Sequence, residues 1–116
     1  MTRILVADDN RQLVEMLRAM LEDAGYDVVC ASSGLAASAL LDKEEVDLLI
    51  LDVLMPGMSG DAVADLLRRS RPDLPVLLMT GDSGESFVPG TAYPVLHKPF
   101  SEQQLVEAVR LLLPPA

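Results

Sequence analysis

Five side chains with charged or hydroxyl groups each stand at or near the end of a short apolar run of the sequence. They are Asp8, Asp9, Asp52, Thr80 and Lys98. If one fold brings the three carboxylates together, each pair repels by roughly 4 kcal/mol at about 4 Å and an effective dielectric of about 20. A hard divalent cation is the simplest compensation, and carboxylate oxygens with room for water suit Mg²⁺ better than Ca²⁺. With one histidine and one cysteine, the sequence offers no cluster for zinc.

A metal beside a carboxylate, a hydroxyl group and an ammonium group is the set that phosphoryl transfer to an acid requires. Asp52 ends the apolar run 48–51 and is the candidate nucleophile. The cation and Lys98 would neutralise the phosphoryl oxygens, and Thr80 would donate a hydrogen bond to them. The residues therefore predict a phosphoacceptor site at Asp52.

The elements that must position these residues alternate between strand and helix patterns. Apolar runs favour buried strands at residues 4–7, 26–31, 46–51, 76–79 and 93–97. Apolar residues at helical spacing predict helices at about 13–24, 34–43, 60–70 and 102–113. Such alternation implies a doubly wound α/β fold with five parallel strands, whose active groups collect at the carboxyl ends of the strands. Each site residue alone would fit a structural role, such as a helix cap or a solvated strand end, but their joint position on one rim favours the phosphoacceptor site.

Local signals mark where several helices begin and end. Gly25 is placed as a helix stop, and Ser33 and Ser59 are placed as helix caps. Ser101 and Gln104 form a capping box. The segment 81–92 contains glycines and a proline that leave no room for a stable helix of normal length, so we expect it to be irregular and mobile.

Composition limits the classes of partner. The chain of 116 residues is long enough for one domain, and its net charge of -9 disfavours direct contact with nucleic acid or an anionic membrane surface. No apolar run is long enough to span a membrane, and the first acid comes too early for a signal peptide, so we expect a cytoplasmic protein. Cys30 is the only cysteine, which excludes an internal disulfide and is interpreted as a small buried hydrophobic residue.

The sequence resembles the response-regulator receiver domains of two-component phosphorelay signalling. The matching pieces are Asp8-Asp9, residues 52–60, Thr80-Gly81 and Lys98-Pro99-Phe100, in the right order along the whole chain. The resemblance implies a single receiver domain over residues 1–116. It also implies a flavodoxin-like (βα)5 fold with strand order 2-1-3-4-5.

The resemblance further implies a function for each site residue. Asp52 would accept a phosphoryl group from the phosphohistidine of a sensor histidine kinase or a histidine phosphotransfer protein. Asp9, Asp52 and the backbone carbonyl of Leu54 would bind Mg²⁺, and Asp8 would act through water. Thr80 and Lys98 would contact the phosphoryl group, and Thr80 would move inward to signal to a downstream protein target. Such a switch is not a conventional enzyme, because it catalyses only its own phosphorylation and dephosphorylation.

Departures from the receiver pattern concern signal transmission. Val95 stands where receivers often carry a switching aromatic residue, and Tyr93 lies two residues earlier, on the same face of an extended strand. The stretch from Thr80 to Lys98 is about one helical turn shorter than usual, so we expect a fourth helix that is short or disordered, and a monomer. The chain is interpreted as a stand-alone receiver or the receiver of a hybrid kinase.

Other functions fit the same residues less well. An aspartate-nucleophile phosphohydrolase typically has a second acid two residues after the nucleophile, where this chain has Leu54. A flavodoxin-like nucleotide or flavin site is disfavoured by the acids at positions 8 and 9, and a degenerate receiver by the presence of all five site residues. The acids Asp42, Glu44, Glu45 and Asp47 are interpreted as a solvated helix end, and His97 as an exposed or packing residue.

Overall fold

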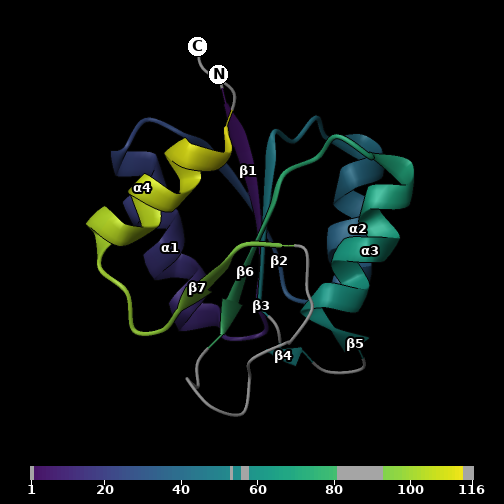
Figure 1. Ribbon diagram of the computed structural model, residues 1–116, viewed down its shortest axis with the longest axis horizontal. Helices are drawn as coiled ribbons and strands as arrows, with labels where there is room; N and C mark the ends of the chain where they lie inside the picture. Colours follow the sequence, from purple (N-terminus) through teal and green to yellow (C-terminus); the bar gives the residue numbers. More distant parts are fainter. Residues whose placement is uncertain (1, 53, 56–57, 81–92, 114–116) are drawn as a thin grey trace.

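The computed structural model describes residues 2–52, 54–55, 58–80 and 93–113. Its centre is a parallel sheet of five strands, with helices on both faces (Figure 1). The strands are β1 (Arg3–Ala7), β2 (Asp27–Ala31), β3 (Leu48–Asp52), β6 (Val76–Thr80) and β7 (Val95–His97). They lie in the order β2-β1-β3-β6-β7, which confirms the predicted strand order 2-1-3-4-5. The doubly wound α/β fold follows from this order.

The helices cover the sheet in pairs. They are α1 (Arg11–Asp23), α2 (Gly34–Lys43), α3 (Gly60–Ser70) and α4 (Glu102–Leu112). In Figure 1, α1 and α4 lie on one face of the sheet, and α2 and α3 lie on the other. The predicted caps at Ser33 and Ser101 are confirmed, the latter with its capping box, and Gly25 has the positive φ of 98° that favours glycine after a helix.

β3 shows how the core holds the site. Leu49 and Leu51 pack with residues of α2 and α3, and Leu48 and Ile50 pack with residues of α1 and α4. All four side chains are fully buried, and burial of each such side chain contributes about 1.5–3 kcal/mol. Because β3 is buried on both faces, the position of its last residue at the rim of the sheet is firmly set.

Some strands begin or end at other residues than predicted, because the hydrogen bonds to neighbouring strands set their limits. β7 begins at Val95, after Pro94, because proline has no N–H to donate. Two short antiparallel strands, β4 (Leu54–Met55) and β5 (Met58–Ser59), follow β3 and were not predicted, since two-residue strands are too short to show periodicity. The irregular segment 81–92 and the short fourth helix expected there lie outside the described residues.

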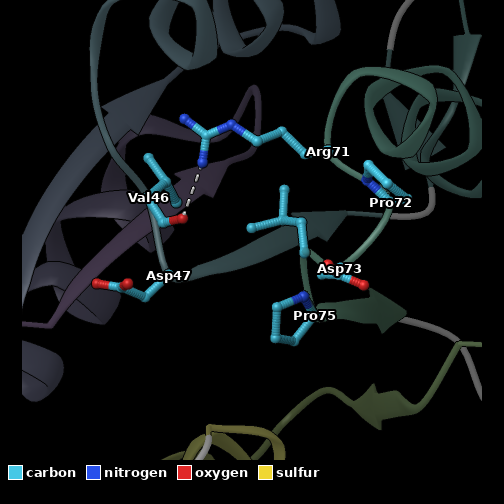
Figure 2. A pocket seen from close by; sticks show the side chains of 7 residues that line it. Val46, Asp47, Arg71, Pro72, Asp73 and Pro75 are labelled. Atoms are coloured by element: carbon cyan, nitrogen blue, oxygen red, sulfur yellow. Dashed lines mark hydrogen bonds between the residues drawn. The ribbon is translucent and has the colours of Figure 1, made fainter.

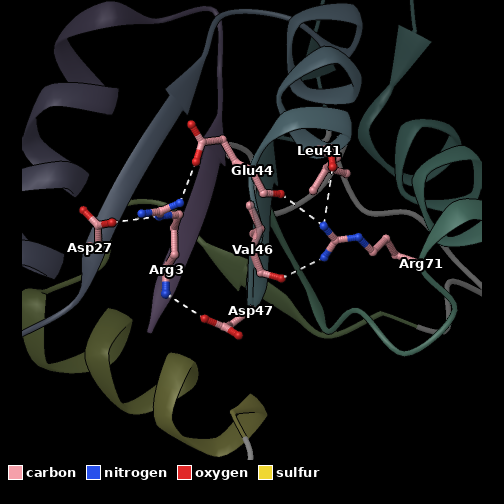
Figure 3. Close-up of polar contacts among 7 residues, drawn as sticks. All are labelled: Arg3, Asp27, Leu41, Glu44, Val46, Asp47 and Arg71. Carbon is pink, nitrogen blue, oxygen red and sulfur yellow. Dashed lines mark hydrogen bonds and ion pairs between the residues drawn. The ribbon is translucent and has the colours of Figure 1, made fainter. Parts of the chain in front are cut away.

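Arg3 joins three elements at the amino ends of the strands (Figure 3). Its backbone N–H donates to the carboxylate of Asp47, its Nε donates to Asp27 at 2.7 Å, and its guanidinium pairs with Glu44. The predicted solvated helix end is therefore wrong for Glu44, which is half-buried in this pair. Asp42 and Glu45 are exposed as predicted.

Arg71 binds backbone groups at the same end of the sheet. Its guanidinium donates to the backbone oxygens of Leu41, Glu44 and Val46, which belong to the end of α2 and the approach to β3 (Figure 3). A cavity of about 410 Å³ lies beside it, lined by Val46, Asp47 and residues 71–75 (Figure 2). This cavity lies at the amino ends of β3 and β6, opposite the rim that carries Asp52.

Replacing Arg71 by alanine is expected to lower the free energy of unfolding by about 2 kcal/mol, because three carbonyl groups lose a charged donor. Arg71→Lys should recover only part of this loss, since the single nitrogen of an ammonium group cannot replace the two guanidinium nitrogens that reach these carbonyl groups. Urea denaturation measures both changes. The control is Arg69→Ala at an exposed position of α3, and equal losses for Arg69→Ala and Arg71→Ala would contradict the prediction.

Candidate functional site

Asp8 and Asp9 follow β1 at the rim formed by the carboxyl ends of the strands. Asp8 is only 1% exposed, whereas Asp9 lies on the surface. Asp8 Oδ1 accepts a hydrogen bond from the backbone N–H of Asn10 at 2.9 Å. Asn10 in turn caps α1, because its side chain accepts from the backbone N–H of Leu13. The start of α1 therefore fixes the Asp8 carboxylate on the rim.

Lys98 lies between two buried carboxylates. Its Nζ is 3.4 Å from Asp52 Oδ2 and 3.4 Å from Asp8 Oδ2. The Coulomb attraction at such a distance is about 5 kcal/mol per pair at an effective dielectric of about 20, before the cost of desolvation. Lys98 follows β7, and its backbone N–H donates to the backbone oxygen of Thr80 at 2.7 Å. The ends of β1, β3, β6 and β7 are thus joined through one ammonium group and its own backbone.

Thr80 is the last residue of β6 and is 1% exposed. In the ladder between β3 and β6, Asp52 lies opposite Met79, so Thr80 extends one residue further along the same rim. The ladder with β7 places Thr80 opposite His97, which is exposed as predicted. The structure therefore brings Thr80 to the rim that also carries Asp52 and Lys98.

The acids at the rim form a cluster that suits a divalent cation. One carboxylate oxygen from each of Asp8, Asp9 and Asp52 lies within 4.8 Å of the other two. Three ionised carboxylates minus the one charge of Lys98 leave two negative charges, which a divalent cation balances. The oxygen-only donor set is the one that Mg²⁺ prefers. The residues present therefore fit a magnesium ion.

Leu54, whose backbone carbonyl is the remaining predicted metal ligand, lies in β4. It follows Asp52 by two positions in the chain, and its carbonyl stays a predicted ligand.

The comparison with known families decides the classification. A family model described as the response regulator receiver domain matches residues 4–110. The chain belongs to the response regulator receiver domains. The resemblance seen in the sequence is thereby confirmed.

Relatives of this receiver domain include longer regulatory proteins. The chain is 39% identical to the response regulator MprA of Mycobacterium leprae and 42% identical to the transcriptional regulatory protein TctD of Salmonella typhimurium. It matches with 96% of its own length in each case, but spans only 50% and 51% of those proteins.

Solved structures agree with this fold over nearly the whole chain. The response regulator protein TrrA of Thermotoga maritima, solved with Mg²⁺ and BeF, is 35% identical, with a TM-score of 0.86 and coverage of 97% of this chain and 100% of that one. The chemotaxis protein CheY4 of Vibrio cholerae is 28% identical, with a TM-score of 0.88 and coverage of 97% and 99%. Receiver domains are signalling modules, and TrrA shows that a relative of this fold holds Mg²⁺.

Burial makes ionisation of Asp8 unfavourable in this receiver domain. Desolvation raises the pKa of the Asp8 carboxyl, and the nearby Asp52 charge adds to the rise. The hydrogen bond from Asn10 and the charge of Lys98 oppose it without cancelling it. A raised pKa in the folded state means that stability is fully present below the ordinary value of 3.8 and is lost as the pH rises through the folded pKa. At neutral pH, the metal-free site therefore costs folding free energy.

Asp8→Asn is expected to stabilise the metal-free protein at pH 7 by about 1 kcal/mol, because it removes a buried charge while Lys98 keeps its pair with Asp52. The variant should also lack the loss of stability between acidic and neutral pH. Thermal melting in EDTA across this pH range measures both effects. Asp9→Asn is the matched control, and its effect should be smaller because Asp9 is exposed. If Asp8→Asn melts below the wild type in EDTA, the attraction of Lys98 outweighs the burial cost and the account of the site is wrong.

The structure also shows contacts near the site that the sequence pattern did not predict. An apolar groove beside Lys98 is lined by Leu13, Met16, Pro99 and Phe100, and Met16 is 44% exposed within it. Tyr93 and Val95 pack against the same core cluster, which agrees with their predicted common face, but the hydroxyl of Tyr93 reaches Asp65 on α3. Pairings of this kind join residues far apart in the chain and leave no trace in local periodicity.

None of the helices in the described part of the chain is both long and apolar enough to cross a membrane.

Proposed function

We propose that this receiver domain is a phosphoaccepting switch that takes a phosphoryl group onto Asp52 from a phosphohistidine, in the presence of Mg²⁺. The observation that carries the proposal is the position of Lys98 Nζ, 3.4 Å from both Asp8 and Asp52, beside a carboxylate cluster that fits a divalent cation. The donor would be a sensor histidine kinase or a histidine phosphotransfer protein. The phosphorylated form would then signal to a downstream protein target.

In the proposed transfer, a carboxylate oxygen of Asp52 attacks phosphorus, and the bond from phosphorus to the donor imidazole breaks. The imidazole leaves with the electron pair of that bond and takes up a proton. The ammonium group of Lys98 would pair with the phosphoryl oxygens and neutralise part of their charge. The hydroxyl of Thr80 would donate a hydrogen bond to one of these oxygens. No side chain has to act as a base, because the attacking carboxylate is already ionised.

Asp9, Asp52 and the carbonyl of Leu54 would hold the magnesium ion directly, with Asp8 acting through water. Both oxygens of Asp8 already accept protein hydrogen bonds, from Asn10 and Lys98, which supports an indirect role. When bound, the cation neutralises the charge of the acids and of the phosphoryl group.

Residues 1–116 would form one such domain, acting in the cytoplasm as a monomer, either alone or as the receiver of a longer protein such as a hybrid kinase. Direct contact with nucleic acid is not proposed for these residues, because their net charge of -9 repels phosphates. A protein donor that approaches Asp52 from the side of Lys98 would meet the apolar groove of Leu13, Met16, Pro99 and Phe100.

Incubation with acetyl phosphate and Mg²⁺ tests this function. A switch should gain one phosphoryl group per chain, seen by intact-mass spectrometry. It should release phosphate no faster than its phosphorylated form is hydrolysed. An aspartate-nucleophile phosphohydrolase would instead release many equivalents of phosphate from a small phosphoester. A protein that gains no mass and releases no phosphate would overturn the proposed switch.

A further inference from the structure

Tyr93 joins β7 to α3 through its ring and its hydroxyl group. Tyr93 Oη donates to Asp65 Oδ1 at 2.6 Å, a short hydrogen bond of a hydroxyl group to a carboxylate. The guanidinium carbon of Arg68 lies 5.6 Å from the centroid of the Tyr93 ring, within reach of a cation–π interaction. Arg68 is itself held, because its Nη2 donates to the backbone oxygen of Pro72 at 2.8 Å. We refer to Asp65, Arg68 and Tyr93 as the α3–β7 latch.

The latch compensates for weak anchoring of β7. This strand has three residues, lies at an edge of the sheet, and contains no fully buried side chain. A short edge strand forms few backbone hydrogen bonds to the sheet and packs little against the core, so its position is weakly fixed. Tyr93 precedes β7 by two positions, and its ring packs against the core cluster that contains Val63 and Leu67 of α3. The latch therefore gives β7 a second anchor at its amino end.

Both elements that the latch joins lead to the phosphoacceptor site. α3 follows Asp52 through the short strands β4 and β5. β7 ends immediately before Lys98, whose backbone N–H is bonded to Thr80. Lys98 follows Tyr93 by five positions, which correspond to about 16 Å of extended chain. A movement of β7 along α3 would therefore change where the Lys98 ammonium group stands relative to Asp52.

The hydrogen bond to Asp65 also argues against Tyr93 acting as the switching aromatic residue that many receivers carry near this position. Val95 lies opposite Leu78 in the ladder with β6, so Tyr93 lies still further from Thr80 along the strand. Burial and the bond to Asp65 raise the pKa of the Tyr93 hydroxyl, so it stays a donor to Asp65 across the physiological range. Tyr93 is thus held against α3.

We propose that Tyr93 and Asp65 are positioning residues for phosphoryl transfer: their hydrogen bond fixes β7 against α3 and so sets the reach of Lys98 toward Asp52. The kinetic part of this inference rests on the proposed function. The structural part, the placement of Lys98 by the latch, does not depend on it.

The experiment compares the wild type with Tyr93→Phe, Asp65→Ala and the double variant. Tyr93→Phe keeps the ring on Arg68 and in the core but removes the hydroxyl group. Tyr26→Phe is the matched control, since Tyr26 precedes β2 at the opposite edge of the sheet and packs in the other core cluster. Two readouts are measured: hydrogen exchange at the Lys98 amide, and the rate of phosphorylation by acetyl phosphate at saturating Mg²⁺.

Exchange at the Lys98 amide should be about 5-fold faster in Tyr93→Phe and in Asp65→Ala, because the hydrogen bond between these two side chains, which restrains β7, is lost. Phosphorylation should be about 3-fold slower in both, because small displacements of a positioning group reduce the rate. The double variant should differ little from Tyr93→Phe, since Asp65→Ala removes a bond that Tyr93→Phe has already lost. Tyr26→Phe should change neither readout.

Tyr93→Phe with a lower melting temperature but unchanged Lys98 exchange or an unchanged rate would overturn the inference and leave the latch a purely stabilising contact. Effects of Tyr93→Phe and Asp65→Ala that add in the double variant would also overturn it. A wild type that gains no phosphoryl group would instead count against the proposed function, and the exchange measurement would still decide whether the latch places Lys98.

Discussion

Asp52→Asn is expected to abolish phosphorylation by acetyl phosphate, with no added phosphoryl mass after an incubation that modifies the wild type fully. An amide has nearly the shape of the carboxylate, but it lacks the negative charge and the free electron pair that attack phosphorus. Because β3 is buried on both faces and sets the position of its last residue, no neighbouring acid can take the same place. Intact-mass spectrometry measures the loss.

The control for Asp52→Asn is its stability. Removing one of three clustered charges relieves repulsion, so the variant should melt at or above the temperature of the metal-free wild type. Loss of phosphorylation then reports chemistry and not unfolding. Phosphorylation of Asp52→Asn at more than about a hundredth of the wild-type rate, a difference of about 2.7 kcal/mol in activation free energy, would place the nucleophile elsewhere.

Removal of Mg²⁺ is expected to slow phosphorylation of the wild type by at least about 100-fold, because a cation at such a site is worth several kcal/mol of charge stabilisation. The same ion should stabilise the fold. Binding to the folded state alone adds about 2.7 kcal/mol at a free concentration 100 times the dissociation constant. Rates of phosphorylation and melting temperatures, measured in EDTA and in excess Mg²⁺, check both effects.

Asp8→Asn and Asp9→Asn serve as controls for the metal effect, since both remove part of the acidic cluster and should shrink the rise in melting temperature on adding Mg²⁺. Calcium at the same ionic strength separates specific binding from screening. Equal rates of phosphorylation in EDTA and in Mg²⁺ would contradict the assigned metal site.

The rim of this receiver domain was predictable because parallel strands place their carboxyl ends at one edge. Asp8, Asp52, Thr80 and Lys98 each end or follow an apolar run, and a run that is apolar on both faces becomes a buried strand. Caps were predictable for a similar reason, as at Ser33 and Ser101, because a capping side chain bonds to a backbone group three residues away. These cap signals are local, and the structure confirms the caps at Ser33 and Ser101.

Contacts between distant residues were not predictable from the same patterns. The acids around Glu44 were predicted to form a solvated helix end. The ion pair of Glu44 with Arg3 was not predictable, because it depends on how β1 packs beside the end of α2. The bond from Tyr93 to Asp65 spans 28 residues and depends on how β7 meets α3. Periodicity shows which face of an element is buried, whereas a specific polar pair is decided by the final packing of two elements.

The most direct test of the central claim is to locate the phosphoryl group. The wild type is phosphorylated with acetyl phosphate and Mg²⁺, reduced with borohydride to trap the acyl phosphate, and digested for tandem mass spectrometry. We expect the modification at Asp52 alone, and none in the peptides that carry Asp8, Asp9 or the other acids. A modification at Asp9 or at any residue other than Asp52 would contradict the assignment, and so would a wild type that is not modified at all.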